Sequence, residues 1–142
     1  MTLKKLICIL KYKKLGAFTL FELLIAMAII GILSALSVPV FLPLISRTKS
    51  TEAKLQLRHI LMLEKNHFYI NSKYTTDVND LGYEQAKLVT ADGNANYKID
   101  ILDASVNNFT AKATAVVDFD GDGQFNVWQI TADEKLKEVT PD

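Results

Sequence analysis

One carboxylate, Glu22, is the only charged side chain in the apolar segment from position 18 to position 45. A helix of that length would run about 42 Å at ~1.5 Å per residue, and the hydrocarbon core of a bilayer is ~30 Å thick. A carboxylate in or near lipid costs on the order of 2.5 to 3.5 kcal/mol, so Glu22 is expected to have a function and a cationic partner. The alternative is a capping box, in which Thr19 caps the helix and Glu22 accepts a hydrogen bond from the backbone amide of Thr19.

A second group of carboxylates, Asp118, Asp120 and Asp122, stands at alternate positions with Gly123 sixth in the series. This spacing opens an EF-hand calcium loop, in which oxygen ligands converge as the glycine permits a sharp turn. The twelfth position, however, is Gln129 rather than a bidentate glutamate. The loop is therefore a candidate site for Ca²⁺, the one cofactor that the sequence offers, with an incomplete EF-hand ligand set.

Two readings of the acidic loop stay open. For calcium, Asp133 or Glu134 would have to complete the ligand shell from the next turn. Without calcium, the segment is a solvated Asp/Gly turn of a β-hairpin, for which this composition is ordinary. Three clustered carboxylates repel one another unless something neutralises them, which keeps the metal in consideration.

Other reactive groups are sparse. Glu64 and His67 form one Glu-x-x-His pair, but a di-iron bundle needs two such pairs plus two more carboxylates. We therefore expect them on the helix surface. The sequence has no recognisable nucleophile motif and no glycine-rich phosphate loop, and we predict that the protein is not an enzyme.

Length and charge restrict the architecture. The 142 residues leave room for one membrane helix and one globular domain of roughly 95 residues. The first 17 residues carry five lysines and no acid, so the remainder has 11 basic and 16 acidic residues, which argues against nucleic acid as a ligand. The one cysteine is Cys8, so the chain after position 17 can form no internal disulfide.

The lysine-rich start also predicts membrane topology, because such a flank beside an apolar span stays in the cytoplasm. The rest of the chain is then outside. A secretory signal peptide cleaved near positions 34–37 is the alternative, but its apolar region would span only roughly 7 to 15 residues. Here the apolar run continues to position 45, so the span is expected to stay in the mature protein.

The segment from Lys14 to Leu33, KLGAFTLFELLIAMAIIGIL, resembles the class III signal of type IV pilins and type II secretion pseudopilins. Gly31 and Pro39 also stand at the spacing typical of that family. Beyond the apolar segment the resemblance is looser and rests on Tyr74-Thr75 and on Leu81-Gly82-Tyr83.

The resemblance implies processing. In such proteins a prepilin peptidase cuts before the phenylalanine on the cytoplasmic side and methylates the new amino terminus. The family usually has glycine before the cut, whereas this chain has Gly16 followed by Ala17. A cut between Ala17 and Phe18 is preferred to one after Gly16, because it makes Glu22 the fifth mature residue, as in the family.

The resemblance also implies assembly. A new α-amine has a pKa of about 7.7 to 8.0, so it is largely protonated near neutrality and is costly to place in lipid. Pairing the Phe18 amine of one subunit with Glu22 of another would neutralise both charges. Gly31 and Pro39 would belong to the same assembly helix. Implied partners are further copies in a helical filament, the prepilin peptidase, an assembly platform protein and an ATPase.

The elements that position these groups follow from periodicity. Apolar residues continue with helical spacing on one face to positions 71–72, namely Ala53, Leu57, Ile60, Leu61 and Phe68. A second stripe, Leu55, Met62 and Tyr69, falls on the opposite face, which suggests burial against a neighbouring subunit. Pro39 and Pro43 are expected to interrupt the helix.

After the helix, residues 73–96 read as a long loop. Alternating segments at 97–103, 109–117 and 125–131, and a short one at 135–139, predict three or four antiparallel strands. The expected class is α+β and pilin-like. Its parts are a leader at 1–17, a membrane and assembly helix at 18–45, an amphipathic helix at 46–72, and a loop and sheet at 73–142.

The sequence therefore predicts a structural subunit of a type IV pilus-like filament, or fimbrium. It would be an inner-membrane precursor with a cytoplasmic N-terminus and then part of an extracellular pilus. The first alternative is a pseudopilin of a type II secretion system, in a periplasmic filament. The alternative of another class is a monomeric membrane-anchored calcium-binding module.

Overall fold

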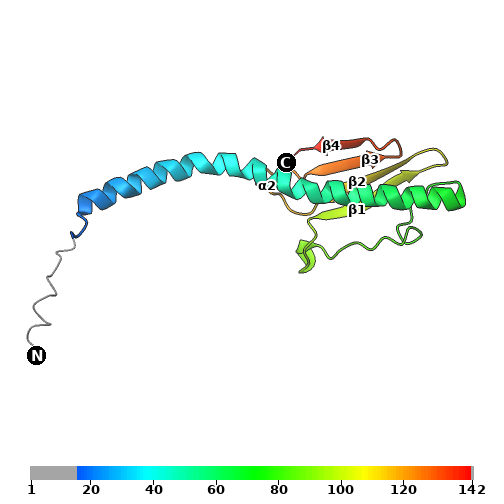
Figure 1. The fold of residues 1–142 in the computed structure, drawn as a ribbon, viewed down its shortest axis with the longest axis horizontal. Coiled ribbons are helices and arrows are strands. Elements are labelled where there is room, and N and C mark those ends of the chain that lie inside the picture. The colour runs from blue at the N-terminus through cyan, green and yellow to red at the C-terminus, as the bar shows by residue number, and fades with distance from the viewer. Residues whose placement is uncertain (1–15, 142) are drawn as a thin grey trace, which may run out of the picture. The chain divides into compact units, whose positions relative to one another are not determined.

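A computed structural model describes residues 16–141 of the chain. One long helix, α2 (Leu20–Asn71), is followed by a short 3₁₀ turn, η1 (Val89–Ala91), and by four strands (Figure 1). The chain divides into two compact units between Ser37 and Val38. The α+β class expected from the sequence is confirmed.

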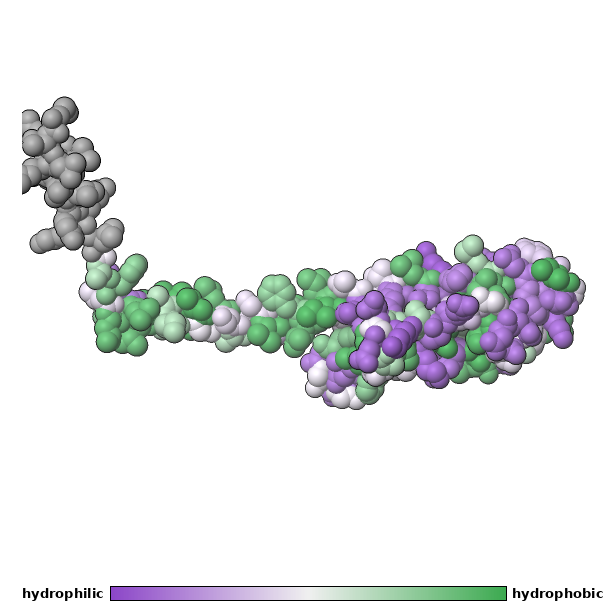
Figure 2. All heavy atoms as spheres, turned by 90° about the horizontal axis from the view of Figure 1, so that it is seen from below, coloured by the Kyte–Doolittle hydropathy of each residue, from purple (hydrophilic) through white to green (hydrophobic). Residues whose placement is uncertain are grey.

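The first part of α2 is apolar and exposed. Its large side chains lie open to the surroundings, from Leu20, 77% exposed, to Ile45, 45% exposed. Figure 2 shows this part of the helix as predominantly hydrophobic. By length and composition α2 is the one helix in residues 16–141 that could cross a membrane. Packing among residues 16–141 leaves this surface uncovered.

The interruption expected at the prolines is absent. Pro39 and Pro43 both lie inside α2, and the helix is continuous from Leu20 to Asn71. A proline removes only its own amide donor and disturbs the preceding turn, and neighbouring hydrogen bonds can carry the helix past it. The helix ends where Ser72 adopts a left-handed conformation with φ 56° and donates its N–H to the carbonyl of Phe68.

The sheet is an antiparallel meander of four strands in sequence order. The strands are β1 (Tyr97–Ala104), β2 (Phe109–Ala115), β3 (Val127–Thr131) and β4 (Leu136–Thr140). The predicted strands are confirmed with shifts of a few residues at their ends. Each connection is local, so every strand pairs with the next one in the chain.

The domain core lies between the second half of α2 and one face of this sheet. Ala53, Leu57 and Ile60 of the helix are fully buried, in agreement with the predicted apolar face. Opposite them, β2 contributes Ala111 and Ala113, both fully buried. Because these side chains are small, helix and sheet can pack closely without voids.

The predicted second stripe of α2 is exposed in the single chain. Leu55 and Met62 are 64% exposed, and Tyr69 is 80% exposed. The loop from position 73 to 96 is irregular apart from η1, and it contributes Leu81 and Tyr83 to the core. Gly82 between them has φ +66°, a conformation that glycine adopts without strain.

Candidate functional site

The first turn of α2 contains the capping box that the sequence offered as one reading of Glu22. Glu22 Oε2 accepts the backbone N–H of Thr19 at 2.9 Å and the hydroxyl of Thr19 at 2.9 Å. In return, the backbone N–H of Glu22 donates to Thr19 Oγ1 at 3.2 Å. These bonds satisfy donors that a helix N-terminus otherwise leaves open.

The capping box leaves one oxygen of Glu22 available. Both accepted bonds fall on Oε2, and Oε1 accepts no hydrogen bond within residues 16–141. The side chain is exposed, as are Ala17 and Phe18 just before the helix. Glu22 can therefore serve as a cap and still receive a cation on its second oxygen.

Gly31 lies in the exposed apolar part of α2, and apart from its two chain neighbours and the nearby backbone of α2 no atom stands within 4 Å of the place a Cβ would occupy. This glycine therefore makes no close approach within the single chain. A glycine on an exposed helix surface allows another helix to come near the backbone. Pro39 lies two turns further along the same helix.

The three aspartates of the acidic loop do come together. One carboxylate oxygen from each of Asp118, Asp120 and Asp122 lies within 4.8 Å of the others. The loop connects β2 to β3, so strands flank it as the sequence predicted. Hard oxygen ligands at this separation could hold a cation such as Ca²⁺.

Backbone amides of the loop already bind these carboxylates. Asp118 accepts N–H groups from Gly121 at 2.6 Å and from Gly123 at 2.7 Å, and Asp122 accepts the N–H of Gln124 at 2.7 Å. The amides of Gly123 and Gly121 hold the pKa of Asp118 below its ordinary value. The hairpin-turn reading is thus sufficient to explain the fold of the loop.

The expected completion of a calcium shell by Asp133 or Glu134 is wrong. The acidic loop precedes Val127, where β3 begins, whereas both acids follow Thr131, where β3 ends. The five residues of β3 separate them by more than 10 Å at ~3.4 Å per residue. Asp133 pairs with Lys135 at 3.2 Å, and Glu134 pairs with Lys65 on α2.

The expected surface position of Glu64 is also wrong. Glu64 is fully buried, and its Oε1 has no hydrogen-bond partner among residues 16–141. Its Oε2 accepts the backbone N–H of Thr75 at 3.2 Å. Burial raises the pKa of Glu64, against the smaller lowering effects of the Thr75 amide and of His67.

Glu64 belongs to a set of contacts that fastens the start of the loop to the end of α2. His67 Nδ1 lies 2.9 Å from the carbonyl oxygen of Lys73, and the ring of Phe68 stacks on Tyr74 at 4.9 Å between centroids. Tyr74 in turn packs against Phe109 of β2. The Tyr74-Thr75 pair that carried part of the family resemblance therefore has a structural role in docking the loop.

A second acid of the helix anchors the other end of the loop. Glu52 accepts the backbone N–H of Asn96 at 2.8 Å and its side-chain amide at 2.6 Å, and Lys49 donates to Asn96 Oδ1 at 3.1 Å. No pattern in the sequence indicates this pairing, because 44 residues separate Glu52 from Asn96. Only the polar Asn96 directly before the first strand could have drawn attention.

Comparison with known proteins gives a family motif and a relative. Residues 13–38 match the family model for the prokaryotic N-terminal methylation motif. Over 66 residues the chain is 39% identical to the type IV major pilin protein PilA of Myxococcus xanthus (strain DK1622). The alignment covers 46% of this chain and 30% of that protein, so this chain spans less than a third of the relative's length.

Proposed function

We propose that this chain belongs to the family of type IV pilins and type II secretion pseudopilins and is a structural subunit of a pilus-like filament. The observation that carries the proposal is the exposed apolar part of α2 with Glu22 as its one charge. Such a surface must be covered by lipid or by other helices. The methylation motif at residues 13–38 supports a mature protein in which other helices, rather than lipid, cover this surface.

Processing would create the partner that Glu22 lacks. Cleavage between Ala17 and Phe18 by a prepilin peptidase leaves a new amine, which is methylated, four residues before Glu22. The amine of one copy can then bind Oε1 of Glu22 in another copy, while Oε2 keeps the capping box. Charge neutralisation away from water selects this register, and the apolar faces supply most of the association.

The exposed second stripe of the helix supports the same arrangement. Leu55, Met62 and Tyr69 have no cover within the single chain and would pack against a neighbouring subunit. Gly31 and Pro39 lie in the assembly helix, where the missing side chain of Gly31 lets a second helix approach. The protein acts by assembly and catalyses no reaction.

The subunit would begin as an inner-membrane precursor with its lysine-rich start in the cytoplasm and its domain outside. It would then move into an extracellular pilus with the help of an assembly platform protein and an ATPase. A pseudopilin of a type II secretion system shares this chemistry and would remain in a periplasmic filament. The candidate of another class is a monomeric anchored module that binds calcium at Asp118, Asp120 and Asp122.

The first test is the intact mass and N-terminal sequence of the protein in filaments sheared from cells, compared with the membrane fraction. A methylated Phe18 start in sheared filaments supports a surface pilus, and the same start found only in cells supports a pseudopilin. An unprocessed chain confined to membranes, in cells with an active prepilin peptidase, would refute both readings and leave the anchored module.

The second test separates the two roles of Glu22. Glu22→Gln removes the charge, and Thr19→Ala removes the hydroxyl of the capping box but leaves the carboxylate. An unpaired buried charge costs about 3 to 5 kcal/mol, so Glu22→Gln should lower filament yield by at least about a hundredfold, because it leaves the amine unpaired. Thr19→Ala should assemble. Equal yields from Glu22→Gln and the unmodified chain would sink the charge-pair mechanism.

A further inference from the structure

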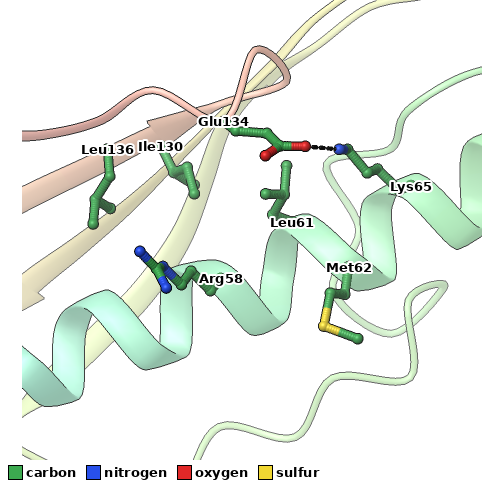
Figure 3. A pocket seen from close by; sticks show the side chains of 7 residues that line it. All are labelled: Arg58, Leu61, Met62, Lys65, Ile130, Glu134 and Leu136. Carbon is green, nitrogen blue, oxygen red and sulfur yellow. Dashed lines mark hydrogen bonds and ion pairs between the residues drawn. The ribbon is translucent and has the colours of Figure 1, made fainter.

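A groove runs between α2 and the β3–β4 edge of the sheet. Its volume is about 440 Å³, and Leu61, Ile130 and Leu136 form its apolar floor (Figure 3). Ile130 is almost fully buried, whereas Leu136 at the start of the edge strand is only partly covered. The groove therefore offers apolar surface that the single chain does not fill.

One cation of the groove is paired and the other is free. Lys65 bonds to Glu134 across the groove, and this bond raises the pKa of Lys65 and lowers that of Glu134 (Figure 3). Arg58 is exposed and has no ion pair or hydrogen bond within residues 16–141. In Figure 3 its side chain extends from α2 toward Leu136. The groove thus presents a free guanidinium beside apolar side chains.

The two sides of the domain carry opposite charge. Residues 46–71 contain five basic residues and two acids, and both acids are committed internally, Glu52 to Asn96 and Glu64 to Thr75. Residues 73–142 contain six lysines and 13 acids. The helix surface of one copy is therefore electrostatically complementary to the sheet and loop surface of another.

The acidic loop is the segment whose chemistry mirrors the groove. It concentrates three carboxylates within 4.8 Å, and none of them forms an ion pair within the described residues. Apolar side chains stand on both sides of these acids, since Val117 is 38% exposed and Phe125 is 45% exposed. The loop therefore presents carboxylates flanked by apolar side chains, which complement the guanidinium of Arg58 beside the apolar side chains of the groove.

We propose that this groove binds the Val117–Phe125 loop of a second copy of the chain, with Arg58 on the aspartates and Phe125 against the floor. The inference rests on the proposed function, because a filament brings copies together in parallel. It names the surfaces through which neighbouring domains contact one another. A planar guanidinium can donate hydrogen bonds to several carboxylate oxygens at once in a fixed geometry, whereas a lysine at this position would act as a point charge.

The positions of the acidic loop and of Arg58 along the axis of α2 predict how far two contacting copies are displaced from each other. The loop follows β2 at Val116, whose N–H donates to Asn96, and Asn96 is held by Glu52. The base of the loop is thus level with Glu52, and Arg58 lies six residues, or about 9 Å, further along α2. Two parallel copies displaced by about that distance bring the loop of one to the groove of the other.

Cysteine cross-linking in the full-length protein tests the contact directly. After Cys8→Ser the chain has no other cysteine, so Arg58→Cys combined with Asp122→Cys gives the only pair. Cells are oxidised with diamide, a metal-free thiol oxidant, in the presence of EDTA, since calcium on the loop would compete with Arg58 for the same carboxylates. The matched control is Arg58→Cys with Asp103→Cys, an exposed acid toward the other end of the sheet.

Cross-linked dimers are expected from the Arg58 and Asp122 pair and not from the control pair or either single variant. Dimers in sheared filaments support both the contact and the filament. Dimers in membranes without any filaments support the contact and refute the proposed function. Filaments that form normally but yield no dimer overturn the contact and leave the proposed function intact, and equal dimer yields from both pairs overturn it as well.

Charge exchange gives an independent readout. Arg58→Glu places like charges together and should lower sheared filament mass by at least roughly tenfold. Combining it with Asp122→Lys should restore most of the yield. Lys137→Glu, the same charge change on an exposed residue of β4 outside the groove, should have little effect. A full yield from Arg58→Glu alone would overturn the contact.

Discussion

The buried carboxyl of Glu64 makes the stability of the domain depend on pH in an unusual direction. In the part of the chain that the structure describes, its Oε1 has no partner and its Oε2 accepts only the amide of Thr75, and burial raises its pKa above the ordinary 4.5. Well below pH 4.5 the group is protonated in the folded and unfolded chain alike. Above 4.5 the unfolded chain loses the proton first, so stability falls as pH rises until it passes the folded pKa.

The perturbation is Glu64→Gln, which keeps an oxygen for Thr75 and cannot titrate. A buried polar atom without a partner costs about 1 to 3 kcal/mol. We therefore expect the stability of the unmodified protein, relative to Glu64→Gln, to drop by about 1 to 3 kcal/mol above pH 4.5. For a domain of this size each kcal/mol moves the melting temperature by about 4 to 8 °C.

The assay is thermal unfolding by far-UV circular dichroism of processed protein in detergent micelles, from about pH 4 to about pH 8, a range that begins below the ordinary pKa of Glu64 and extends well above it. Glu134→Gln is the control of opposite sign, because the bond from Lys65 lowers the pKa of Glu134 and that contribution is lost as pH falls. A melting-temperature difference between Glu64→Gln and the unmodified chain that stays constant with pH would refute the reasoning. A difference that favours the unmodified chain at high pH would show that Glu64 is a paired carboxylate.

Three further outcomes are expected. Gly93→Ala should lower stability by about 1 to 3 kcal/mol in the same melts, because the added Cβ would overlap the carbonyl oxygen of Lys87; an unchanged melting temperature would contradict this packing. Lys54→Met should cost about 0.5 to 1 kcal/mol and shift the fluorescence of Trp128, the sole tryptophan, because the Lys54 ammonium lies 4.2 Å from its ring centroid; identical spectra would count against the contact. Calcium at about ten times a millimolar dissociation constant should stabilise the protein by about 1.4 kcal/mol, EDTA should reverse this, and Asp120→Asn should remove it; no calcium response would leave the loop a hairpin turn.

Local patterns in the sequence were enough to predict the helix and the strands. The 3.6-residue spacing of Ala53, Leu57 and Ile60 predicted the buried face of α2, since a helix repeats its faces over a few residues. Alternation predicted β1 to β4 for the same reason, and the meander topology follows because each strand pairs with the next. The Pro39 and Pro43 prediction was wrong because a proline weakens a helix locally, and the rest of its hydrogen bonds can still hold it.

The candidate sites also differ in whether their residues are close in sequence or are brought together by the fold. Thr19 with Glu22, and the three aspartates of the acidic loop, can be identified from spacing alone because their members are close in sequence. Whether those aspartates gain further ligands depended on β3, which carries Asp133 and Glu134 to the other end of the sheet. Spacing along the chain says nothing about that separation.

The sequence by itself determined the apolar segment of the helix, its lone acid, the methylation motif and the α+β order of elements, because each depends on residues a few positions apart. Only the tertiary structure decided that Glu64 is buried under a loop that folds back at Thr75, and that Glu134 crosses to Lys65 from 69 residues away. It alone left Arg58 unpaired beside an apolar groove within the described residues 16–141. Burial and pairing over such distances depend on how helix and sheet pack, which no local periodicity encodes.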